Sequence, residues 1–113
     1  MEELNQLETA ELCTPEAREN QLRAVRSLAG RARQNEVVHR ELIQMLERVS
    51  DQGAAEVFLA YYLEGSERPS ARTLANRFFV DKRTAFKQLL RVCDQLRIML
   101  FGVDALFDLT SRQ

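Results

Sequence analysis

Residues 70–89, SARTLANRFFVDKRTAFKQL, contain two short helical periods separated by a tight corner. Apolar residues spaced three or four positions apart define the two periods: Leu74, Ala75 and Phe78, then Ala85, Phe86 and Leu89. Ser70 can cap the first helix and Asp81 the second, because short polar side chains accept hydrogen bonds from the first free amides of a helix. The small Ala75 lets the two helices cross closely. The stretch therefore predicts a short helix over 71–78, a corner, and a second, longer helix.

The composition of the 113-residue chain favours helices throughout. Only four Gly and two Pro are present, and β-branched residues do not form runs. The hydrophobic fraction of 45% and the charged fraction of 29% are those of an ordinary folded protein. We therefore expect an all-α protein, with a long N-terminal helical arm followed by a C-terminal helix-turn-helix domain that has an extended second helix.

The charge distribution is uneven, although the net charge is only −1. Residues 1–65 contain 7 Lys/Arg against 12 Asp/Glu, whereas residues 66–113 contain 9 against 5. The basic part includes the two-helix unit, and a basic surface there is typical of proteins that bind a polyanion such as DNA.

The N-terminal half predicts one long helix. Thr14 and Pro15 form a helix start, and no strong breaker follows before about Val49, since Gly30 alone costs only about 1 kcal/mol. A helical seam can be laid along this stretch: Val25, Leu28, Ala32, Asn35, His39, Leu42, Leu46 and Val49. Residues 1–50 thus form the arm, which is a candidate for dimerisation.

Two interpretations of this seam remain open. It can be a dimerising coiled coil in which the polar Asn35 and His39 fix the register. It can also be one helix of a globular bundle, with these two residues at a wetter part of the surface. The arginines at 18, 23, 26, 31 and 33 likewise suit either a phosphate-binding face or a solvated face paired with acids.

Residues 51–113 are the predicted DNA-binding domain. Asp51 can cap a central core helix over 54–63, whose aromatic residues Phe58, Tyr61 and Tyr62 lack interleaved basic residues and so suit a core better than a base-stacking platform. The second helix of the motif should run from Lys82 to about Phe101 and stop at Gly102. Short helical turns are also expected at 2–12 and 105–109.

The second helix would read DNA with the outward side chains of its first turns. These candidates are Lys82, Arg83, Thr84, Lys87, Gln88 and Arg91. Arg72 and Arg77 on the first helix, together with Arg68 in the preceding loop, are candidates for contacts to the DNA backbone. Ala85, Phe86 and Leu89 are expected to face inward.

Residues 54–97 resemble the helix-turn-helix of region four in bacterial sigma factors, and the phage late-gene activators of the ArpU and RinA kind. The pairs that carry the likeness are Glu64-Gly65, Leu74-Ala75, Val80-Asp81 and Arg83-Thr84, followed by Leu89. The resemblance implies a small transcriptional regulator of phage or prophage type, and RNA polymerase becomes a candidate partner. The chain departs from the pattern at Phe79, which stands where Gly is usual in the corner.

The sequence offers little for catalysis. It has one His, no Gly-rich phosphate loop and no metal-ligand cluster, so we expect no enzyme, no catalytic residues, no metal and no cofactor. Cys13 and Cys93 are expected to be reduced thiols in a cytoplasmic protein, and no membrane segment or export signal is recognisable. A sequence-specific regulator that binds double-stranded DNA as a homodimer is the leading interpretation. The alternative is a helical protein-interaction module that binds RNA polymerase, a sigma factor or a phage packaging protein.

Overall fold

A computed structural model describes residues 14–102. Their elements are α2 (Pro15–Ala32), α3 (Glu36–Leu46), α4 (Gln52–Phe58), the π-helix η1 (Leu59–Leu63), α5 (Ala71–Arg77) and α6 (Lys82–Phe101). The all-α prediction is confirmed, since these residues include helices and no strand. The turns predicted at 2–12 and 105–109, like Cys13, lie outside the described residues.

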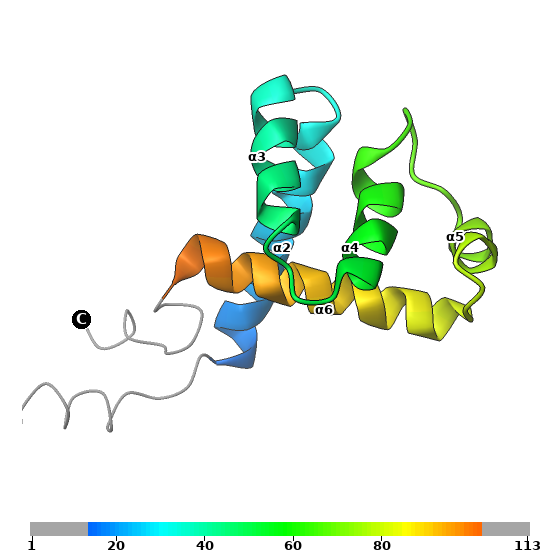
Figure 1. Cartoon of the computed structure of the whole chain (residues 1–113). Coiled ribbons are helices and arrows are strands. Elements are labelled where there is room, and N and C mark those ends of the chain that lie inside the picture. The colour runs from blue at the N-terminus through cyan, green and yellow to red at the C-terminus, as the bar shows by residue number, and fades with distance from the viewer. Residues whose placement is uncertain (1–13, 103–113) are drawn as a thin grey trace, which may run out of the picture.

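The helices are arranged around α6 (Figure 1). Helices α2 and α3 lie side by side as a hairpin, α4 stands next to them, and α5 lies near the N-terminal end of α6. Helix α6 passes along the base of this group and contacts α2, α3, α4 and α5. The N-terminal turns of α6 are thus held between α4 and α5, while its later turns pack on α2.

The prediction of one continuous helix from Pro15 to about Val49 is wrong. Helix α2 ends at Ala32, and Asn35 becomes the N-cap of α3, where its Oδ1 accepts hydrogen bonds from the backbone amides of Val37 (3.0 Å) and Val38 (3.2 Å). An Asn side chain competes with the helix for these amides, so it favours a break where it can cap the next helix. The N-terminal half is therefore a hairpin instead of an extended arm.

This break removes the basis for the coiled-coil interpretation of the seam. Its apolar members Val25, Leu42 and Leu46 are buried inside a single chain, whereas Asn35 is exposed and His39 is half-buried. The other interpretation, a globular bundle with the two polar residues at a wetter surface, describes the structure better. One hydrophobic cluster extends from Leu22 to Leu96 across both predicted domains, and the separate roles given to 1–50 and 51–113 stay predictions.

Four helix starts were predicted from capping residues, and all four are confirmed. The caps are Thr14, Asp51, Ser70 and Asp81, and each accepts a hydrogen bond from the backbone amide three residues later, at 2.7–3.1 Å. The end of α6 is confirmed as well, since Gly102 follows Phe101 with a φ of 58°. Local capping signals therefore fix where the chain changes direction.

The corner between α5 and α6, residues 78–81, closes as a Schellman motif. The amide of Phe79 donates to the carbonyl of Asn76 (3.3 Å), and the amide of Val80 donates to that of Ala75 (3.0 Å). This motif needs a left-handed residue after the helix cap, and Phe79 supplies it with a φ of 56°, the one positive φ among the described non-glycine residues. Its side chain is 94% exposed. A residue other than Gly thus adopts the conformation that Gly normally provides.

Replacing this residue by glycine should stabilise the protein. A left-handed conformation costs an L-residue about 1–2 kcal/mol, whereas Gly adds about 0.5–1 kcal/mol of backbone entropy to be lost on folding. We expect Phe79→Gly to raise the free energy of unfolding by about 0.5–1 kcal/mol, measured by urea denaturation. The control is Phe79→Ala, which keeps the Cβ and should therefore not raise the free energy of unfolding. Equal stability of the two variants would contradict the strain argument.

Candidate nucleic-acid interface

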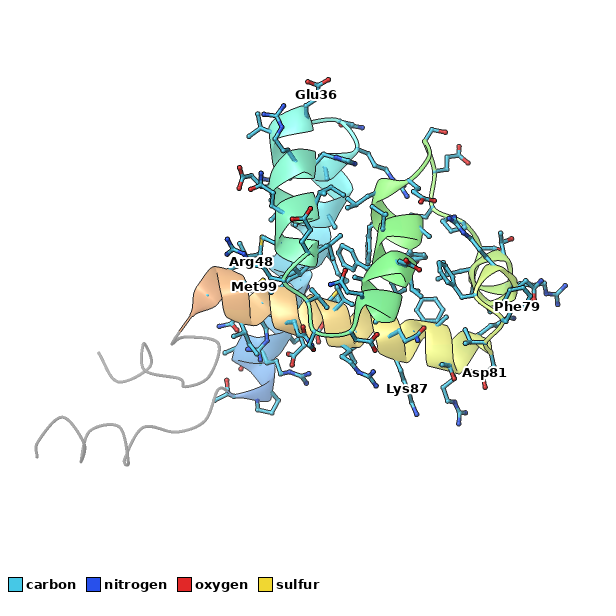
Figure 2. The ribbon with its side chains drawn as sticks, viewed as in Figure 1. Glu36, Arg48, Phe79, Asp81, Lys87 and Met99 are labelled. Atoms are coloured by element: carbon cyan, nitrogen blue, oxygen red, sulfur yellow. The ribbon has the colours of Figure 1, made fainter. Side chains whose placement is uncertain are left out.

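The first two turns of α6 present exposed polar and cationic side chains. Lys82, Arg83, Thr84 and Lys87 are all exposed. None of the three cations forms an ion pair with an acid within residues 14–102. Lys87 projects from the side of α6 that faces away from α4 (Figure 2). The structure therefore gathers four of the predicted residues on one accessible end of a helix.

The other two candidates on α6 have different surroundings. Nη1 of Arg91 donates to Oδ2 of Asp51 at 3.1 Å, which joins α6 to the N-cap of α4. Gln88 is half-buried, and its buried Oε1 accepts no hydrogen bond from the residues that the structure describes. Lys82, Arg83 and Lys87 are thus better placed to meet a ligand than these two residues.

The two candidates on α5 also differ. Arg72 is exposed and forms no ion pair with the described residues. Arg77 donates to the Glu64 carboxylate at 2.7 Å, and this hydrogen bond and charge raise the pKa of Arg77. Both members of that pair are largely solvent-exposed, so it contributes little to stability. Within the described residues, Arg72 has no acidic partner, whereas Arg77 is paired with Glu64.

One acid lies within this basic end of α6. Asp81 accepts a hydrogen bond from the Thr84 amide at 2.7 Å, and the hydrogen bonds from Thr84 hold the pKa of the Asp81 carboxyl below its ordinary value. Its negative charge also complements the positive end of the helix dipole. We interpret Asp81 as a structural cap that stays ionised and leaves the neighbouring cations available.

The prediction that Phe86 faces inward is wrong in part. Ala85 and Leu89 are buried as expected, but Phe86 is 43% exposed. Its ring meets the ring of Tyr61 nearly edge-on, with the centroids 6.0 Å apart. Phe86 therefore lies at the margin of the core, beside Tyr61 of η1.

The aromatic residues before the loop are a core cluster with an open edge. Phe58 and Tyr62 are buried, as predicted, while Tyr61 is half-buried. The guanidinium of Arg68 lies 5.1 Å from the Tyr62 ring centroid and 5.7 Å from that of Tyr61. A hollow of about 290 Å³ opens beside them toward Phe86. Arg68 was a candidate for backbone contact, and its cation is engaged with the two rings.

Three of the five arginines at 18, 23, 26, 31 and 33 have a partner among the described residues. Arg18 contacts Asp94 at 3.2 Å, Arg26 contacts Glu19 at 2.8 Å, and Arg33 donates to the backbone carbonyl of Tyr61 at 2.8 Å. These contacts favour the interpretation of a solvated, acid-paired face over a phosphate-binding one.

The described residues contain no group of three or more potential metal ligands. Cys93 is buried, and burial raises the pKa of its thiol to about 11, which makes it a poor nucleophile near neutral pH. No helix in the part of the chain that the structure describes is long and apolar enough to span a membrane.

Comparisons with protein-family models, with curated proteins and with solved structures found no significant match.

Proposed function

We propose that this protein is a sequence-specific regulator of transcription that binds double-stranded DNA through α5, the corner and α6, acting together as a helix-turn-helix. The observation that carries the proposal is a set of three exposed cations on the first two turns of α6 that form no ion pair within residues 14–102: Lys82, Arg83 and Lys87. The resemblance of residues 54–97 to sigma region four and to phage late-gene activators supports the same role. A cytoplasmic location belongs to this proposal.

The proposed mechanism assigns different tasks to the two helices. The N-terminal turns of α6 enter the major groove, where Arg83 can donate two hydrogen bonds to the edge of a guanine. Lys82, Thr84 and Lys87 are suited to base edges or to flanking phosphates. Helix α5 crosses the DNA backbone, and the exposed Arg72 contacts a phosphate there. The contacts of α6 with α2, α4 and α5 keep it in a fixed orientation, which a sequence-reading helix needs.

The experiment that tests the proposal is binding of the full chain to short DNA duplexes selected from a random-sequence pool. Fluorescence anisotropy should show saturable binding to the selected duplex and weaker binding to a scrambled one. About four phosphate contacts predict that log K falls against log salt with a slope of about −3 to −4, between roughly 50 and 200 mM salt. Absence of binding to every duplex at the lowest salt would refute DNA recognition.

A second candidate function is a helical protein-interaction module. It is favoured by four exposed apolar side chains that follow Phe86 on α6, at Leu90, Ile98, Met99 and Leu100. RNA polymerase, a sigma factor or a phage packaging protein could cover them. A second copy of this chain could cover them as well, since we also propose that the regulator is a homodimer. Binding to purified RNA polymerase that survives loss of Lys82 and Arg83, together with no DNA binding, would favour this module. The molar mass in solution decides whether the chain is a dimer.

A further inference from the structure

Phe79 carries two unfavourable features that nothing inside the described chain offsets. Its backbone is left-handed, with a φ of 56°, and its ring is 94% exposed to solvent. Ring–ring contacts within residues 14–102 involve Phe58, Tyr61, Tyr62 and Phe86, and neither these nor the cation–ring contacts there involve Phe79. Strained residues concentrate at sites of function, so an observed strain of this kind is a reason to look for an external partner.

The corner holds Phe79 in a defined position. The amides of Phe79 and Val80 both donate to carbonyls of α5, and Val80 packs against the hydrophobic core. Two residues after Phe79, Asp81 caps α6 through the Thr84 amide. The backbone is fixed on both sides of Phe79, so its Cβ points in a set direction and the ring needs little ordering when it binds a partner.

The surroundings of the ring indicate what that partner is. Phe79 lies at the same end of α6 as Asp81 (Figure 2), and the exposed cations Lys82 and Arg83 follow within one helical turn. An exposed aromatic ring beside unpaired cations suits a polyanion that also offers apolar surface. Duplex DNA has both properties, since its phosphates border deoxyribose carbons and the methyl groups of thymines.

We propose that Phe79 is a DNA-contact residue whose ring packs against an apolar part of the duplex next to the bases read by Lys82 and Arg83. This inference rests on the proposed function and adds an apolar contact to it. Variants that remove a Lys or Arg charge would not detect that contact. The ring contributes affinity through apolar contact, so its removal should leave the number of phosphate contacts unchanged. Two apolar features are available, the deoxyribose carbons and a thymine methyl group, and the test below separates them.

The test compares Phe79→Gly, Phe79→Leu and the wild-type chain on the duplex selected with the wild type. Phe79→Gly should weaken binding about fivefold to tenfold, as expected for the loss of one apolar contact. The variant should be at least as stably folded as the wild-type chain. Phe79→Leu keeps an apolar side chain and should lose less. The slope of log K against log salt should match the wild type in both variants, because neither removes a charge. Uracil in place of thymine in the duplex should reduce the effect of Phe79→Gly if the ring contacts a methyl group, and leave it unchanged if the ring contacts the sugar.

Each outcome separates this inference from the proposed function. If the wild-type chain binds the selected duplex and Phe79→Gly binds it equally well, the contact is refuted and DNA binding stands. If Phe79→Gly binds DNA normally but loses affinity for purified RNA polymerase, the ring serves a protein partner and the inference is likewise overturned. If the wild-type chain binds no duplex, the proposed function itself fails.

Discussion

Arg83→Ala is expected to weaken binding to the selected duplex about fivefold to a hundredfold, which corresponds to about 1–3 kcal/mol. The side chain is exposed, forms no ion pair within the described residues, and lies on the first turn of α6. A guanidinium in this position can form two hydrogen bonds to guanine, and an alanine leaves both acceptors without a donor. The loss should be largest on the selected duplex and smaller on a scrambled one, so specificity falls together with affinity.

The matched control is Arg91→Ala on the same helix, two turns later. Arg91 donates to Asp51 at 3.1 Å, so its charge is already partly neutralised inside the chain. We expect this variant to weaken DNA binding less than about threefold, as suits the loss of one screened surface charge. Urea denaturation of both variants verifies that neither loss reflects unfolding. Equal losses for Arg83→Ala and Arg91→Ala would indicate general electrostatic attraction in place of base recognition.

Capping residues account for most of what could be predicted about this fold. Ser70, Asp81 and Gly102 are local signals, because each acts on amides or carbonyls within a few residues of itself. The bounds of α6 could therefore be predicted without knowledge of the rest of the chain. Asn35 shows the limit of this reasoning. The same residue suits a polar position in a coiled coil and an N-cap, and the packing of α3 on α2 decides between them.

Periodicity predicts only part of the burial along the later turns of α6, where Val92 and Leu96 are buried at the expected spacing. Arg97 is only 5% exposed, with Nε 2.9 Å from the Asp94 carboxylate and Nη1 2.8 Å from the Gln21 amide oxygen. Met99 and Leu100 continue the apolar spacing of the helix but are exposed in the single chain. A lone Arg in a sequence is normally a surface residue, and only the position of α2 shows that this one faces inward.

For the candidate interface, the sequence correctly indicated which end of α6 is basic and accessible. It could not show which cations are paired, because the partners Asp51 and Glu64 are 40 and 13 residues away from Arg91 and Arg77. The sequence pattern of the corner showed that Phe79 stands at a position where Gly is usual. Its exposure and its left-handed backbone became visible only in three dimensions.

Phe58→Ala is expected to lower the free energy of unfolding by about 3–5 kcal/mol. Phe58 is fully buried at the C-terminal end of α4, its ring centroid lies 4.7 Å from that of Tyr62, and α4 packs directly on α6. Removing the ring leaves a cavity in the middle of the hydrophobic cluster, and the surrounding helices can close it only in part. A domain of this size has about 5–15 kcal/mol of stability in total, so the variant should be close to unfolding at physiological temperature.

The matched control for this prediction is Phe86→Ala, which removes the same ring from a position that is 43% exposed and borders the cluster. It should cost about 1–2 kcal/mol, because partial burial removes less apolar area from water and leaves no closed cavity. Urea denaturation followed by circular dichroism measures the free energy of unfolding of both variants, and equal losses of stability would contradict a core centred on Phe58.

Because Phe58 does not reach the surface, the folded fraction of Phe58→Ala should still bind the selected duplex with wild-type affinity. Arg83→Ala should bind it weakly although this variant is fully folded. The two variants thus separate the residue that supports α6 from the residue proposed to read DNA.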